Sequence, residues 1–432
     1  MKWFARLAWL GRVARDVVVE TSDGRFEKVT EGATRPAEAT ELHGIMLPGL
    51  ANSHSHVFHR ALRGRTEGGD FWAWRREMYR LAAALDPDAY FRIARATYAE
   101  MALAGVTVVG EFHYLHHPPP GGSRYSDPNE MGNALIRAAS EAGVRLTLLD
   151  TCYLRGDFDR PLLDVQWRFS DGDVQAWAER VALIQESENV RVGGAIHSVR
   201  AVDGESIRTI AGFGAGRPLH VHVSEQPSEN ERCLSFTGLT PTRLLAEAGV
   251  WEVGATAVHA THLEEDDIRL LGSGGAHVCL CPTTERDLGD GIGPARRLRD
   301  AGAGLCVGSD SQAVIDLLEE ARLIELHQRL TTGRRNLHDP TELLEAVTST
   351  SSLGWDGGEI APGRRADFIT VRLDTPRTAG ADDHILGRLV FSATAADVDT
   401  VVIGGREIVR SGHHLEVEDP AAELRRALEA IG

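Results

Sequence analysis

The sequence predicts an α/β protein made of a (β/α)8 TIM barrel and a small β-sandwich domain formed by both chain ends. Three observations lead to this prediction. Eight short β-branched runs alternate with longer amphipathic stretches between residues 44 and 357. Residues 1–43 and 358–412 contain short alternating strands with Gly turns and no long helices. The chain, with 432 residues of which 42% are hydrophobic, is long enough for one large and one small domain.

The eight predicted barrel strands end in polar or Gly-rich residues, as parallel βα units require. In chain order they span residues 44–56, 106–114, 145–154, 190–198, 217–225, 254–263, 276–285 and 303–311. Helix-like stretches, several with Asp or Thr as N-caps and a closing Gly, cover residues 86–105, 127–143, 173–187, 240–249 and 264–274. Residues 116–129 are predicted to form a long loop, and residues 413–432 a terminal helical unit.

Composition restricts the partners and the compartment. The formal net charge is −17. Nucleic acids and anionic membranes bind preferentially to basic surfaces, so this charge argues against both as partners. The five cysteines are scattered, which is typical of a reducing cytoplasm rather than of a disulfide framework. No apolar run reaches membrane-spanning length. We therefore expect a cytoplasmic protein that binds neither nucleic acid nor membrane.

Candidate metal ligands lie where predicted strands end. His54 and His56 are two residues apart and share one face of an extended strand. Alone, such a pair is equally well explained by surface or hydrogen-bonded histidines. His222 and Asp310 end the fifth and eighth predicted strands, however, and parallel barrels present side chains at that end. Three His and one Asp suit a borderline-soft ion with one position left for water.

Two further residues are candidates for the chemistry. Glu225 follows His222 by three residues, so it is expected just beyond the strand end, where a general acid or base is needed. His259 ends the apolar run within the sixth predicted strand and is either another ligand or a hydrogen-bonding group that stabilises developing charge. His262 competes with it for this position.

The motifs "PGLANSHSH", "HVSE", "VHATHL" and "GSDS" resemble, in this order, those of the amidohydrolase superfamily. The flanking "PGRRADFITVRLD" and "VIGGREIVRSG" resemble its small β-domain. Binuclear members bridge two ions with a carboxylated lysine, and the only lysines here are Lys2 and Lys28. The resemblance thus implies a barrel of the metal-dependent hydrolase type with one zinc ion, or alternatively iron(II).

Longer strings, among them "FWAWRREMYRLA", "HVSEQPSEN" and "LCPTTERDLGDGIGP", resemble the formimidoylglutamate deiminases of histidine degradation. This resemblance implies hydrolysis of N-formimino-L-glutamate, a small dicarboxylate, to N-formyl-L-glutamate and ammonia. It implies zinc ligands and catalytic residues as well: His54, His56, His222 and Asp310 bind the ion, and Glu225, His259 and Asp310 act in catalysis. The implied substrate-binding residues are Arg80, Tyr114, His197, Arg200 and His59. The expected assembly is a homodimer.

Two residues depart from that family's pattern, and two other functions stay open. His59 stands where Gln is expected, and Gln312 where His is frequent, so both are expected to line the pocket and affect substrate fit. One alternative is a deaminase of a purine, pyrimidine or related ring. The other is a barrel without catalytic activity that captures a ligand.

Overall fold

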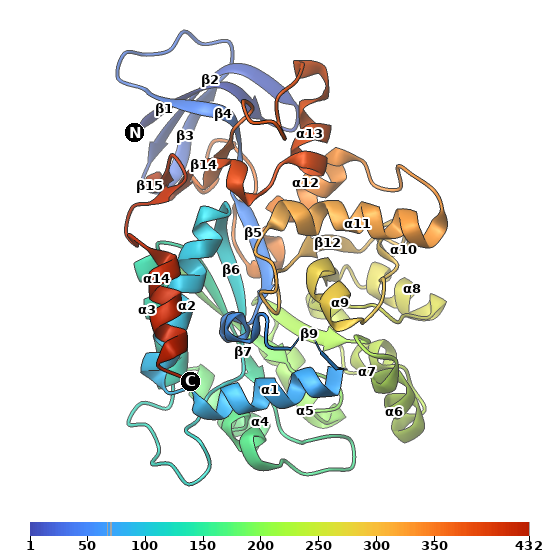
Figure 1. Cartoon of the computed structure of the whole chain (residues 1–432). Coiled ribbons are helices and arrows are strands. Elements are labelled where there is room, and N and C mark those ends of the chain that lie inside the picture. Colours follow the sequence, from blue (N-terminus) through green and yellow to red (C-terminus); the bar gives the residue numbers. More distant parts are fainter. Residues whose placement is uncertain (67, 70, 432) are drawn as a thin grey trace.

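The computed structural model describes residues 1–66, 68–69 and 71–431, and its centre is a parallel β-barrel (Figure 1). Eight strands pair in sequence order from first to last. A parallel bridge between Ser55 and Asp310 joins the last strand to the first. The barrel strands are β5 Leu50–Ser55, β6 Val106–His113, β7 Arg145–Cys152, β8 Val190–Ile196, β9 Leu219–Val223, β10 Thr256–His259, β11 His277–Leu280 and β12 Gly304–Val307. The predicted (β/α)8 fold is confirmed.

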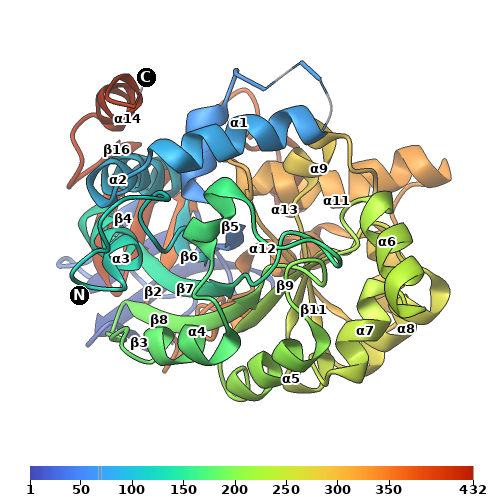
Figure 2. The ribbon, with the colours of Figure 1, turned by 90° about the horizontal axis from the view of Figure 1, so that it is seen from below.

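Helices surround these strands, as the view from below shows (Figure 2). Asp86, Asp203 and Thr240 cap the helices that follow them, because each side chain accepts a hydrogen bond from the first helical turn. The helices are α1 Phe71–Ala84, α2 Pro87–Leu103, α3 Glu130–Ala142, α4 Val174–Val181, α5 Gly204–Phe213, α6 Pro227–Thr237, α7 Pro241–Glu247, α8 Glu265–Ser273, α9 Pro282–Leu288, α10 Ala295–Asp300, α11 Leu317–Thr332, α12 Pro340–Thr348, α13 Ile385–Ser392 and α14 Pro420–Glu429. Helix α4 is shorter than the predicted stretch 173–187.

Both ends of the chain form a second, mixed sheet, seen above the barrel in blue and red (Figure 1). Its order is β16-β15-β14-β13-β4-β1-β2-β3. The strands are β1 Lys2–Trp9, β2 Val13–Ser22, β3 Arg25–Thr30, β4 Thr40–Pro48, β13 Phe368–Val371, β14 Val398–Ile403, β15 Arg406–Arg410 and β16 His413–His414. Trp3, Phe26 and Phe368 pack in its core.

Several boundaries differ from those expected from the sequence. The seventh strand, expected over residues 276–285, ends at Leu280, and Pro282–Leu288 form helix α9. Residues 44–48 belong to β4, because Ile45 to Pro48 pair with β13 of the terminal sheet, and the barrel strand β5 starts only at Leu50. The segment 358–412 contains helix α13, which was not expected. Residues 413–414 form β16, so the terminal helix begins at Pro420. Apolar residues on both sides of Pro48 and Gly49 conceal the change of sheet at Gly49.

Within the described part of the chain, no helix combines the length and the apolar character that crossing a bilayer requires.

Candidate metal centre and active site

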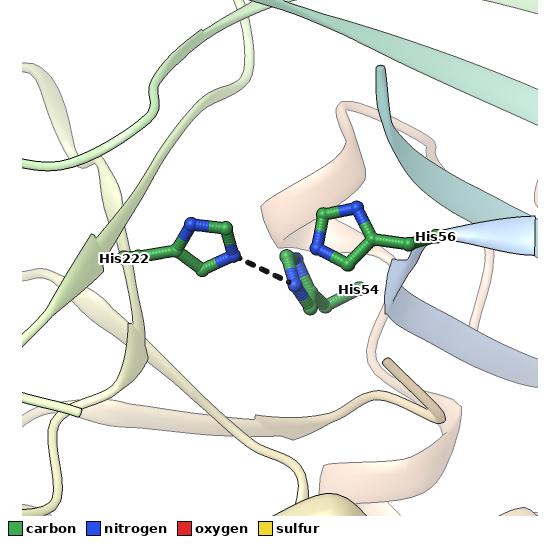
Figure 3. A group of neighbouring side chains, drawn as sticks. All are labelled: His54, His56 and His222. Atoms are coloured by element: carbon green, nitrogen blue, oxygen red, sulfur yellow. Dashed lines mark hydrogen bonds between the residues drawn. The ribbon is translucent and has the colours of Figure 1, made fainter. Parts of the chain in front are cut away.

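The four predicted metal ligands converge at one end of the barrel. Figure 3 shows the three histidines among them, His54, His56 and His222. His54 lies in β5, His56 directly follows this strand, and His222 lies in β9. The Nε2 atom of His222 is 3.1 Å from that of His54. Asp310 places Oδ1 3.3 Å from His54 Nε2 and 3.5 Å from His56 Nε2. Side chains from the first, fifth and last barrel strands therefore meet at one centre.

The protonation of the histidines fits a cation at this centre. His56 Nδ1 donates to the carbonyl oxygen of Phe112 at 2.9 Å, and His222 Nδ1 donates to that of His197 at 2.9 Å. A neutral imidazole that donates through Nδ1 carries a lone pair on Nε2. Burial lowers the pKa of both histidines well below the ordinary value, which favours this neutral form. Lone pairs and a carboxylate that face one another across such short distances are the donor set of a metal ion.

Backbone strain accompanies the ends of the strands at this centre. His259, Asp310 and Ser224 have φ values of 68°, 42° and 53°, in the left-handed region that non-glycine residues rarely adopt. Each such residue costs about 1–3 kcal/mol and persists only where the surrounding structure imposes the conformation. The packing of the barrel thus maintains this backbone conformation after β9, at the end of β10 and after β12.

His259 and Glu225 lie beside the proposed ligands. His259 Nε2 is 3.7 Å from Asp310 Oδ2 and 3.9 Å from Glu225 Oε1. Its Nδ1 is 3.5 Å from Glu285 Oε1 on the opposite side. Burial opposes protonation of His259, but Glu225, Glu285 and Asp310 outweigh it and raise the pKa of His259 well above the ordinary value. The arrangement provides a hydrogen-bond donor next to a carboxylate.

The position of Glu225 suits proton transfer. Its side chain is 17% exposed and contacts the cavity in front of the centre. Burial raises the pKa of Glu225, while the positive charge of His259 partly offsets that rise. A carboxyl group with a raised pKa exchanges a proton more readily near neutral pH than an ordinary glutamate does.

A cavity of about 60 Å³ ends at the metal centre and opens toward a second one of about 380 Å³. Four of the predicted substrate-binding residues line the first cavity: His59, Tyr114, His197 and Arg200. His59 Nε2 and the Tyr114 hydroxyl lie 3.0 Å apart. Arg200 Nε is 3.5 Å from Oε1 of the buried Glu229. The structure thus brings these residues together in front of the proposed ligands.

The prediction for Arg80 is wrong. Its side chain is 60% exposed and pairs with Glu77 on the surface of α1. Arg75 of the same helix lines both cavities instead, and its Nε donates to the Tyr79 hydroxyl. The two arginines are five positions apart in the helix, which corresponds to a rotation of about 140° around its axis. Trp74 and Met78, which line the cavity beside Arg75, could have identified the inward face from the sequence.

The expectation that Gln312 lines the pocket is also wrong. Gln312 has no exposed surface and does not line the cavity. Its side chain forms hydrogen bonds with Ser309, Ser55 and the carbonyl oxygen of Asp310, away from the cavity.

A barrel with three histidines and an aspartate at its C-terminal rim defines the chain as a protein of the metal-dependent hydrolase type. Residues 45–408 match the model of the Amidohydrolase family. The chain therefore belongs to the amidohydrolase family, and it is a hydrolase that acts on carbon–nitrogen bonds.

Individual relatives agree with this assignment. The chain is 36% identical to formimidoylglutamate deiminase of Pseudomonas aeruginosa over 436 residues, which cover 96% of each chain. It is 29% identical to 8-oxoguanine deaminase of the same species over 441 residues, or 96% of this chain and 93% of the other. A solved amidohydrolase from Brucella melitensis superposes with a TM-score of 0.90 at 29% identity, covering 100% of this chain and 99% of that one.

Proposed function

We propose that the chain is a zinc-dependent deaminase that hydrolyses N-formimino-L-glutamate to N-formyl-L-glutamate and ammonia in histidine degradation. The observation that carries the proposal is the pair of guanidinium groups, Arg75 and Arg200, in the cavity that ends at the His–Asp centre. Guanidinium groups recognise carboxylates through paired, charge-assisted hydrogen bonds. A substrate with a formimino group at one end and two carboxylates at the other matches this arrangement. The similarity to the Pseudomonas deiminase supports the same assignment.

The proposed centre holds one ion. His54, His56, His222 and Asp310 would bind it, and iron(II) is compatible with the same ligands. When bound, the metal would supply Lewis acidity that makes water a nucleophile near neutral pH.

The surrounding side chains would move the protons. Asp310 and His259 would orient water for attack on the carbon of the protonated formimino group, and Glu225 accepts one proton of this water. Glu225 then delivers this proton to the terminal nitrogen, which becomes a good leaving group. As the carbon–nitrogen bond breaks and ammonia leaves, the second proton of the water passes from the hydroxyl oxygen to the Asp310 carboxylate, and the carbonyl of the formyl group forms. His259, which lies 3.9 Å from Glu225, would donate a hydrogen bond to the oxygen that develops negative charge.

The other end of the cavity would bind the glutamate part. Arg75 and Arg200 would each pair with a carboxylate, and Tyr114 and His197 would donate further hydrogen bonds. His59 lies against Tyr114, so it would fix the orientation of that hydroxyl.

A substrate panel tests the proposal. The purified protein is loaded with zinc and offered N-formimino-L-glutamate, N-formimino-L-aspartate, 8-oxoguanine and cytosine, and ammonia release is measured. We expect the highest kcat/KM for N-formimino-L-glutamate. A ring substrate that exceeds it would support the alternative, which the similarity to 8-oxoguanine deaminase and the aromatic side chains of the cavity, Trp74, Tyr153 and Phe169, favour. Zinc binding without ammonia release from any substrate would support a ligand-binding protein.

A further inference from the structure

Gln312 connects the two strands that close the barrel. Its side-chain Nε2 donates to Ser55 Oγ at 3.0 Å and to the carbonyl oxygen of Asp310 at 2.8 Å. Its Oε1 accepts a hydrogen bond from Ser309 Oγ at 2.7 Å. Ser55 lies between the proposed ligands His54 and His56, and Ser309 directly precedes the proposed ligand Asp310. One buried amide therefore bonds to both segments that supply the centre with three of its four ligands.

A few other hydrogen bonds join the end of β5 to the residues that follow β12. The Asp310 N–H donates to the carbonyl oxygen of His54, and the His56 N–H donates to that of Asp310, each at 3.0 Å. Asn52 Nδ2 donates a hydrogen bond to Ser309 Oγ, and Asn52 Oδ1 accepts one from the Ser309 N–H. The approach is so close that a Cβ on Gly308 would lie 2.7 Å from the Cβ and the carbonyl oxygen of His54. Backbone hydrogen bonds align the two segments, and the side chains of Asn52 and Gln312 add further hydrogen bonds between them.

The hydrogen bonds around Gln312 permit only one orientation of its amide. The carbonyl oxygen of Asp310 can only accept, so the nitrogen of the amide must face it. Ser55 Oγ lies 2.6 Å from Glu111 Oε2 and accepts from the same Gln312 Nε2. Ser309 Oγ accepts from Asn52 Nδ2 at 2.6 Å, so its own proton is available for Gln312 Oε1. Exchanging the amide oxygen and nitrogen would place two acceptors against each other at the carbonyl oxygen of Asp310. We call these five residues the Gln312 network: Asn52, Ser55, Glu111, Ser309 and Gln312.

We propose that Gln312 is a positioning residue of the metal centre, which sets metal affinity by fixing His54 and His56 relative to Asp310. The inference rests on the metal centre of the proposed function, although it is independent of the substrate. Gln312 touches neither the cavity nor the ligand side chains through its amide, so it acts through the backbone of Asp310 and through Ser55. Residues that orient metal ligands typically change metal affinity about 10- to 100-fold when they are replaced.

The test compares Gln312→Met with a control that loses buried hydrogen bonds elsewhere in the barrel. Methionine has similar length and flexibility but cannot replace the amide bonds. Thr147→Val is the control, because Thr147 Oγ1 donates to the carbonyl oxygen of Leu353 and accepts from Trp355 Nε1 near the start of β7. Zinc affinity is measured by competition with a chelator, zinc release by stopped flow, and thermal unfolding on the metal-free proteins.

We expect Gln312→Met to bind zinc about 10- to 100-fold more weakly and to release it faster. Thr147→Val should unfold at a lower temperature yet bind zinc within about twofold of the parent chain. If Gln312→Met does not fold, Ser309→Ala decides, because it removes one bond of Gln312 and should weaken zinc binding several-fold.

Two outcomes would refute the role of Gln312, and a third would refute the metal centre. Equal zinc affinity of the parent and Gln312→Met, or of the parent and Ser309→Ala where only that variant folds, refutes the role of Gln312. An equal loss of affinity in Thr147→Val also refutes it, since the effect would then reflect general destabilisation. A parent chain that binds no zinc refutes the metal centre itself, and with it the proposed function.

Discussion

Replacing Arg75 and Arg80 separately provides the sharpest test of the proposed substrate. Both residues belong to α1, but Arg75 lines the cavity, and Arg80 is 60% exposed and pairs with Glu77. Arg75→Met should raise KM for N-formimino-L-glutamate, because it removes a charged partner of one carboxylate and leaves the metal centre intact. Arg80→Met should change neither kinetic constant, since exposed ion pairs contribute little.

The expected size follows from the contact that is lost. A hydrogen bond to a charged group contributes about 1.5–3 kcal/mol. At about 1.36 kcal/mol for each tenfold change, Arg75→Met should lower kcat/KM roughly 10- to 150-fold. If the substrate uses this contact equally in the ground state and the transition state, most of the loss appears in KM.

The assay measures ammonia release over a range of substrate concentrations, with zinc content determined on the same samples. Tyr79→Phe is a second control, because it removes the hydrogen bond that Arg75 donates at 2.9 Å but keeps the positive charge. Tyr79→Phe should lower kcat/KM much less than Arg75→Met does. The reasoning is refuted if Arg80→Met lowers kcat/KM as much as Arg75→Met, or if Arg75→Met behaves like the parent chain.

Four further predictions concern catalysis, the metal and stability. Glu225→Gln should retain zinc but lower kcat about 10²- to 10⁴-fold, the usual contribution of a positioned acid–base group, and near-normal turnover with bound zinc would contradict this role. Asp310→Asn should weaken zinc binding at least about tenfold in a chelator competition, and unchanged affinity would exclude it as a ligand. Removing zinc by dialysis against a chelator should lower the unfolding temperature, because an ion that binds only the folded chain stabilises it; equal temperatures with and without zinc would argue against a structured site. Burial raises the pKa of Asp397, but hydrogen bonds from Arg377, the Thr394 N–H and Thr375 lower it to about 2. Its stabilisation is therefore complete above about pH 4 and lost as the pH falls through about 2, so Asp397→Asn should be less stable at pH 7 and lose less stability between pH 4 and pH 2 in denaturant titrations.

Much of the metal centre could be predicted from the sequence because its residues end strands. Apolar runs that stop at His222 and Asp310 indicate the C-terminal ends of parallel strands, and barrels gather these ends at one rim. His54 and His56 share a face by local alternation alone. The structure brings these side chains within hydrogen-bond distance or slightly beyond it, as this reasoning required.

The cavity was less predictable, because its walls depend on how helices and loops are rotated against the barrel. Arg75 and Arg80 are both arginines of one amphipathic helix, and only the packing of α1 decides which of them faces the centre. Burial of Gln312 similarly depends on the contact between β5 and β12, strands that lie about 250 residues apart in the chain. The change of sheet at Gly49 depends on pairing with β13, from the other end of the chain.

By itself, then, the sequence determined the barrel and the order of its strands, since hydrophobic alternation and turn residues are local properties of the chain. Only the tertiary structure decided which arginine reaches the cavity, where the two sheets divide and what supports Asp310 from behind. These features arise from contacts between segments remote in sequence, and such contacts leave no local pattern to read.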